Sequence, residues 1–242
     1  MAKNNSKPPL LFIHGFRGAP SGVKEIAEQF PEYKVFIPYI PPSGEQSLKK
    51  YDIENYTDFL KAYIEKNKIK KPILIGHSMG SIIAAAFAEK YPKLISNKLI
   101  LLAPIVKKVA KPIVWLSPLT AILPSDLVSF ITNKFLFVPH KNPKLYKHTM
   151  ALAREGAQLV TSKKDVAKSA FFSVSHTVNE FQLSQKILVV TGKKDRIMPQ
   201  KATRAFAKKT DSKVIFLSNS GHLVNYEQPA KTAQAIRAFL EQ

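Results

Sequence analysis

The chain has 242 residues, 45% of them hydrophobic, which is enough for one large α/β domain or for a domain with an inserted subdomain. It contains no cysteine, which excludes disulfides, cysteine-based metal sites and a cysteine nucleophile. The formal net charge is +20, but the lysines are spread in ones and twos and no nucleic-acid-binding motif is present. We therefore expect a solvated basic surface and no nucleic-acid partner, with weak attraction to an anionic membrane surface as the alternative.

The first residues, Met1 to Lys7, are polar and lead within a few positions into an apolar segment, without the hydrophobic region of a signal peptide. No run of about 18 apolar residues occurs that could span a membrane as a helix. A cytoplasmic protein is the resulting expectation. The oligomeric state is left open.

The first half of the chain alternates short apolar runs, typical of buried strands, with segments suited to helices. The strands expected in this half are residues 10–13, 34–40, the run that leads into a turn at 72–80, and 98–106. The expected helices are residues 23–30, 51–67 and a third that ends near Tyr91. Such alternation predicts a mostly parallel sheet with helices on both faces.

The alternation stops after residue 106 and resumes with a strand over 186–191. The segment between them, 107–185, is too long for an ordinary loop, so we expect an inserted helical lid with helices beginning near Ser125 and Ser162. A helix from Gln200, a strand over 213–217 and a last helix follow. The predicted core is thus formed by residues 1–106 and 186–242.

A G-x-S-x-G pattern, Gly76-His77-Ser78-Met79-Gly80, lies between an expected strand and an alanine-rich helix. In such a turn the serine is held at strained backbone angles with its hydroxyl exposed at the sheet edge, while the glycines leave room for the neighbouring strand and helix. The helix N-terminus can stabilise an oxyanion at the same place. Ser78 is therefore the candidate nucleophile, and a chance match is the alternative.

A serine nucleophile needs a base, and the base needs an acid that orients it. His222 directly follows the last expected strand, and Asp195 follows the strand over 186–191 through a short loop. Both are therefore expected at the sheet edge that carries Ser78. The alternatives are a hydrogen-bonded loop histidine and a turn carboxylate.

With its candidates in the order serine, aspartate, histidine, the sequence resembles the α/β-hydrolase superfamily, and within it the capped serine esterases and lipases of monoacylglycerol-lipase type. The run His14-Gly15-Phe16-Arg17-Gly18 resembles the family's oxyanion loop, which implies that Phe16 N–H and Met79 N–H hold the oxyanion. The insert occupies the position of the family's lid. Because nine residues precede the first expected strand, the family's leading strands are expected to be absent, leaving about six.

The resemblance implies hydrolysis of carboxylic esters through an acyl-enzyme on Ser78, with no metal or organic cofactor. The apolar insert, including Trp115 and Phe130, is expected to form the roof of an acyl pocket. The alternative is that these residues only form the insert's own core. Arg17 and His77 are further candidate substrate contacts. Uncharged short or medium acyl esters, including monoacylglycerols, are the expected small-molecule substrates; Arg17 is the one residue that speaks against this. Thioesters, amides, peptides and C–C bonds remain alternative substrates, and a non-catalytic binding protein of this fold is a further alternative.

Overall fold

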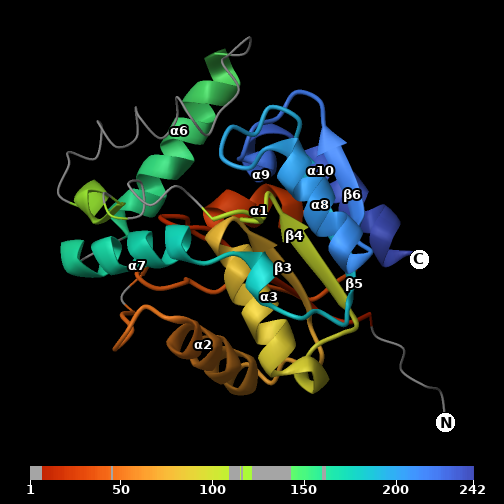
Figure 1. The fold of residues 1–242 in the computed structure, drawn as a ribbon, viewed down its shortest axis with the longest axis horizontal. Helices are drawn as coiled ribbons and strands as arrows, with labels where there is room; N and C mark the ends of the chain where they lie inside the picture. Colours follow the sequence, from red (N-terminus) through yellow and green to blue (C-terminus); the bar gives the residue numbers. More distant parts are fainter. Residues whose placement is uncertain (1–6, 45, 109–114, 116, 122–142, 160–161) are drawn as a thin grey trace.

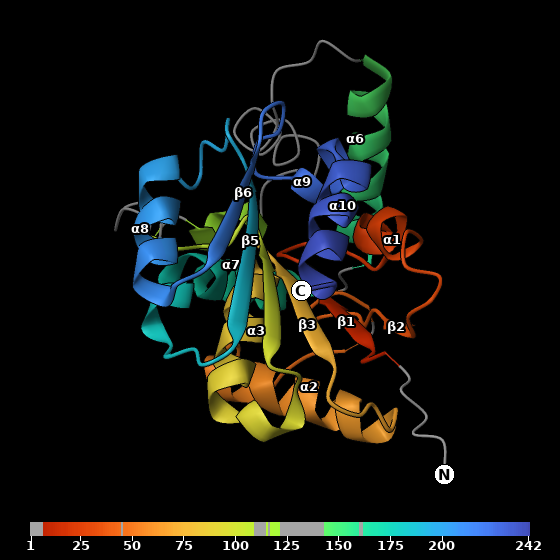
Figure 2. The ribbon, with the colours of Figure 1, turned by 90° about the vertical axis from the view of Figure 1, so that its right-hand side faces the viewer.

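The computed structural model describes residues 7–44, 46–108, 115, 117–121, 143–159 and 162–242 (Figure 1). The helix expected to begin near Ser125, and Phe130 with it, lie outside the described residues. The described chain forms a β-sheet between two layers of helices (Figure 2). The predicted α/β class is confirmed.

Within the described residues, six strands form the sheet in the order β2-β1-β3-β4-β5-β6, and every neighbouring pair is parallel. This confirms the expected number and direction of strands. The second strand is shorter than the predicted 34–40, because Pro38 and Pro41 have no N–H to donate to a neighbouring strand. The strands are β1 (Leu10–Ile13), β2 (Val35–Phe36), β3 (Ile73–His77), β4 (Lys98–Leu102), β5 (Lys186–Gly192) and β6 (Lys213–Leu217).

The two helical layers follow from the two-residue period of the strands. Leu11 and Ile13 pack in one apolar cluster with residues of α2, α3 and α8, whereas Leu10 and Phe12 pack in another with residues of α1, α9 and α10. Figure 2 shows α7 and α8 on one side of the sheet and α1 and α10 on the other. The helices outside the insert are α1 (Ser21–Ala27), α2 (Ile53–Lys66), α3 (Met79–Lys90), η1 (Pro92–Leu94), α8 (Gln200–Thr210), α9 (Val224–Glu227) and α10 (Pro229–Leu240).

Between β4 and β5, the described part of the insert contains further helices. Helix α7 begins where the sequence predicts, because the Ser162 hydroxyl accepts a hydrogen bond from the Asp165 N–H at 3.2 Å. None of the helices in the described part of the chain combines the length and the apolar character needed to cross a bilayer. The insert's helices are η2 (Ser117–Ala121), α6 (Pro143–Gln158), α7 (Lys163–Ser175) and η3 (Val178–Glu180).

Helix α7 packs into the core of the domain. Phe172 is 1% exposed, belongs to the apolar cluster of β1 and α3, and lies with its ring centroid 4.6 Å from that of Tyr56. The hydroxyl oxygens of Tyr56 and Ser169 are 3.1 Å apart, and beyond the helix the Val178 N–H donates to the carbonyl of Ile105 at 2.9 Å. Helix α7 of the predicted lid is therefore part of the hydrophobic core.

Truncation of Phe172 tests how firmly α7 belongs to the core. Phe172→Ala is expected to lower the free energy of unfolding by about 3–5 kcal/mol, because it removes a fully buried aromatic ring. The adjacent Phe171 is 44% exposed, so Phe171→Ala should cost less than about 1 kcal/mol. Urea unfolding measures both values. Small losses in both variants would mean that α7 contributes little to the stability of the core.

Candidate active site

Ser78 lies in the turn between β3 and α3, at φ 52° and ψ −118°. A positive φ is unfavourable for a residue with a side chain and costs on the order of 1–3 kcal/mol, so the surroundings must hold the turn in place. The Ser78 N–H donates to the carbonyl of Leu102 at 3.0 Å. At Gly80 the backbone is so close to β1 that a Cβ would lie 2.1 Å from the carbonyl oxygen of Ile13. Only glycine fits there, and the close approach fixes the turn.

His222 and Asp195 lie beside Ser78, although they come from different loops. His222 Nε2 is 2.9 Å from Ser78 Oγ, and His222 Nδ1 is 2.9 Å from Asp195 Oδ2. The loops after β3, β5 and β6 supply the three side chains, and these loops meet because the carboxyl ends of parallel strands share one sheet edge. The structure therefore brings together the nucleophile, base and acid that the sequence singled out.

The Asp195 carboxylate is fully buried but well supplied with donors. Its Oδ1 accepts hydrogen bonds from the N–H groups of Ile197 and Met198 at 2.8 and 2.9 Å. Burial by itself raises the pKa of Asp195, but the charge and hydrogen bond of His222 and the two N–H groups outweigh it, so the pKa is lowered. An ionised carboxylate only accepts, so the neutral His222 carries its proton on Nδ1 and turns a free Nε2 lone pair toward Ser78.

The loop after β1 lies against Ser78, as an oxyanion loop must. A Cβ on Gly15 would lie 3.1 Å from Ser78 Cβ, so only a glycine backbone approaches this closely without displacing the serine. Phe16 follows directly and is half-buried. Met79 is the first residue of α3, so its N–H is one of the four that have no partner within the helix. Of the two predicted donors, Phe16 thus follows the residue that lies against Ser78, and Met79 follows Ser78 itself.

Two residues that support the loops of the candidate site, His14 and Glu227, were not assigned a role from the sequence. His14 Nε2 accepts a hydrogen bond from the Ile40 N–H at 2.9 Å, so the proton is on Nδ1, which donates to the Gly15 carbonyl at 2.9 Å. Glu227 accepts from the Gly221 N–H at 2.6 Å and so anchors the loop that carries His222. In the sequence, the only signals were the His-Gly pair after a strand and a carboxylate soon after Gly221-His222.

The predicted substrate contacts have different outcomes. His77 is buried, and its Nε2 donates to the carbonyl of His222 at 3.2 Å. His77 therefore fixes the backbone of His222, and we revise the expectation that His77 contacts substrate. Trp115 is 77% exposed, which gives no support to its place in the roof of a pocket. Phe130 lies outside the described residues. Arg17 is half-buried beside Phe16.

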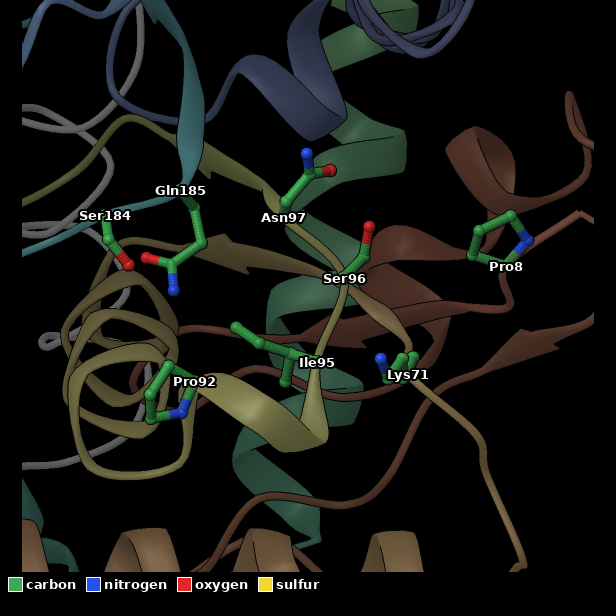
Figure 3. A pocket seen from close by; sticks show the side chains of 8 residues that line it. All are labelled: Pro8, Lys71, Pro92, Ile95, Ser96, Asn97, Ser184 and Gln185. Carbon is green, nitrogen blue, oxygen red and sulfur yellow. The ribbon is translucent and has the colours of Figure 1, made fainter.

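A hollow of about 460 Å³ lies at the opposite edge of the sheet, where the strands begin (Figure 3). Lys71 precedes β3 whereas Ser78 follows it, so the length of the sheet separates this hollow from the candidate site. Across the described ranges, no group of three or more His, Cys, Asp or Glu side chains is arranged to hold a metal ion. The residues lining the hollow are Pro8, Lys71, Pro92, Ile95, Ser96, Asn97, Ser184 and Gln185.

Acid should destabilise the fold through two of the buried histidines, His14 and His77. Burial lowers the pKa of His14 to about 4 and that of His77 to about 3, from the 6.5 of a solvent-exposed histidine. At a pH between the lowered pKa of each histidine and 6.5, the unfolded chain binds more protons than the folded one. The free energy of unfolding therefore has its full value above pH ~6.5 and falls as the pH decreases. We expect a loss of about 2 kcal/mol per histidine at pH 5 in urea unfolding.

The variant for this test is His14→Gln. It removes a buried titrating group and should flatten the loss of stability between pH 7 and pH 5 by about half. An unchanged slope in His14→Gln would contradict the assignment of this pH dependence to His14.

Comparison with known sequences finds matches over most of the chain. A family model described as "Alpha/beta hydrolase family" matches residues 10–235. Lipase 1 of Psychrobacter immobilis is 28% identical over 252 residues, which cover 98% of this chain and 78% of that lipase.

Solved structures show the same fold. A thermophilic esterase from Thermogutta terrifontis, solved with malate bound, has a TM-score of 0.81 and 23% identity, covering 98% of this chain and 90% of its own. A bromoperoxidase from Bacillus anthracis has a TM-score of 0.83 and 17% identity, covering 98% of this chain and 92% of its own. The names of these structures differ although the fold does not, so the likeness alone does not decide the reaction. Because the family match spans nearly the whole sequence, the chain belongs to the alpha/beta hydrolase family.

Proposed function

We propose that this protein is a serine hydrolase that cleaves carboxylic esters, of the capped esterase and lipase type that includes monoacylglycerol lipases. The observation that carries the proposal is the hydrogen-bonded chain from Ser78 through His222 to Asp195, with 2.9 Å at both steps. A relative named as a lipase, aligned over nearly the whole chain, supports the ester as substrate.

In the proposed reaction, His222 Nε2 accepts the Ser78 hydroxyl proton while Ser78 Oγ attacks the ester carbonyl carbon. The tetrahedral oxyanion accepts hydrogen bonds from the N–H groups of Phe16 and Met79, each contributing about a hundredfold or more to kcat. His222 then donates the proton to the departing alcohol, which leaves an acyl ester on Ser78. Water, deprotonated by His222, hydrolyses this ester and restores the serine.

We further propose that the insert, residues 107–185, forms a cap over this reaction. Helix α7 reaches one oxyanion donor, because the Ser169 hydroxyl lies 3.5 Å from Met79 Sδ. Helix α6 lies beside Arg17, the residue after the other donor Phe16, because a Cβ on Gly156 would be 2.4 Å from the carbonyl oxygen of Arg17. Two helices of the insert thus contact the two segments that carry the proposed donors, which is where a cap can exclude water and bound an acyl group.

Single replacements at the serine and histidine test the proposal. Ser78→Ala and His222→Ala should each lower kcat on a soluble ester by about 10⁴–10⁶, and the double variant should be little worse, because the residues act as a unit. Asp195→Asn should lose less, since the nucleophile and base remain. The assay is ester hydrolysis, with circular dichroism to establish that each variant is folded.

Lys208→Ala is the control, because it removes an exposed side chain from the last turn of α8, outside the insert, and its kcat should be normal. A serine-directed phosphonate should label the protein but not Ser78→Ala. Normal turnover by Ser78→Ala would contradict the proposal. Parallel assays with thioesters, amides and C–C substrates would show whether the same three residues act on another bond.

A further inference from the structure

The backbone of Arg17 is held in an unfavourable conformation beside the oxyanion loop. Its φ is 53°, in the left-handed region where glycine is unstrained and other residues cost on the order of 1 kcal/mol. The turn is fixed from both sides: the Gly18 N–H donates to the Gly15 carbonyl at 3.0 Å, and the Ser43 hydroxyl donates to the Gly18 carbonyl at 2.7 Å. The sequence therefore places a long cationic side chain where a glycine would stabilise the loop better.

The side chain of Arg17 has a buried nitrogen that makes no hydrogen bond. Its Nη1 is shielded from solvent and has no partner, and no ion pair joins Arg17 to an acidic side chain among the described residues. Arg237 is different, because it is exposed and pairs with Glu32. A buried polar group without a partner is costly, and a buried cation more so, unless a ligand or counter-ion supplies the missing acceptor.

The arginine itself is unusual in this chain. Only five of the 37 basic residues are arginines, so lysine serves nearly all of the basic surface. A guanidinium differs from an ammonium in its planar fork of donors, which matches a carboxylate or a phosphate with two parallel hydrogen bonds. Burial lowers the pKa of Arg17, but an arginine stays protonated in proteins. The residue that follows Phe16 therefore carries a positive charge, and one of its buried nitrogens has no hydrogen-bond partner among the described residues.

We propose that Arg17 binds an anionic group, a carboxylate or a phosphate, carried by the substrate. The inference rests on the proposed ester hydrolysis, because Arg17 directly follows Phe16, one of the two proposed oxyanion donors. A carbonyl bound there would present its acyl or alcohol part to the adjacent loop residues. This replaces the expectation of uncharged acyl groups, which drew on an apolar roof that the exposed Trp115 does not support.

Matched pairs of esters, identical except for one charge, test this inference. The acyl side is probed with mono-4-nitrophenyl adipate against 4-nitrophenyl hexanoate, and the alcohol side with 4-acetoxybenzoate against its methyl ester. Acetylated glycerol 3-phosphate against monoacetylglycerol distinguishes phosphate from carboxylate. The unmodified protein should give a higher kcat/KM for the anionic member of at least one pair.

Variants of Arg17 should remove that preference. In Arg17→Gln the ratio of kcat/KM for the anionic to the neutral ester should fall about 10- to 100-fold, the usual size of a lost hydrogen-bonded charge pair. Arg17→Lys should lie between, because it keeps the charge but not the fork. Arg204→Gln, which removes an exposed arginine from α8, should keep the ratio of the unmodified protein.

Two results would overturn the inference while leaving ester hydrolysis intact: no preference in any pair, or an equal loss for both members in Arg17→Gln, which would make Arg17 structural. Failure of every ester, together with no phosphonate labelling, would instead overturn the proposed function. If Arg17→Gln does not fold, inhibition of the unmodified protein decides. Adipate or glycerol 3-phosphate should inhibit hydrolysis of the neutral ester, less so at high salt, and an absence of inhibition would contradict the inference.

Discussion

The close contact between the turn after β3 and the end of β1 is the constraint on which the candidate site depends. The backbone of Gly80 presses on the carbonyls of Ile13 and His14, leaving no room for a side chain. Because this contact is made by backbone atoms, it fixes the turn more firmly than any flexible side chain could. It also holds Gly15 against Ser78, so the proposed nucleophile and the proposed oxyanion loop are positioned by the same packing arrangement.

Buried polar groups carry the second half of the site, and each has a partner that fixes its direction. His77 donates a hydrogen bond to the backbone carbonyl of His222, and Asp195 accepts one from Nδ1 of the His222 ring. The other ring nitrogen of His222 then faces Ser78. Such groups are costly to bury unless they are paired, so the same hydrogen bonds that orient the base also keep the sheet edge folded. Chemistry and stability are therefore coupled here, because protonation of a buried histidine would disturb both.

Much of this arrangement could be predicted from the sequence because it depends on local pattern. Apolar runs marked the strands, and G-x-S-x-G between a strand and a helix marked Ser78. The positions of Asp195 and His222 after strands placed them at one edge. What the sequence did not give depends on contacts between distant segments. His77 contacts a residue 145 positions away, and Phe172 packs on Tyr56 across the insert; no local pattern distinguishes these residues from a substrate contact or a lid residue.

Backbone strain connects the two functional proposals. Several described residues other than glycine have a positive φ. Asp211 is the C-cap of α8, and helices commonly end with a residue in this left-handed conformation. Lys68, Lys71 and Ala103 also have a positive φ outside helices and strands, Ala103 directly after β4. Ser78 and Arg17 have theirs in the turns that follow β3 and β1. For Ser78 the strain is explained by the exposed hydroxyl that results. For Arg17 nothing within the described protein explains the strain, and its buried Nη1 has no hydrogen-bond partner there. Strain at a site persists when the surrounding fold over-determines it, and at Arg17 it supports our proposal of an anionic group from outside the chain. The fold is shared by proteins with different names, so the substrate of this protein has to be argued from such residues rather than from the fold.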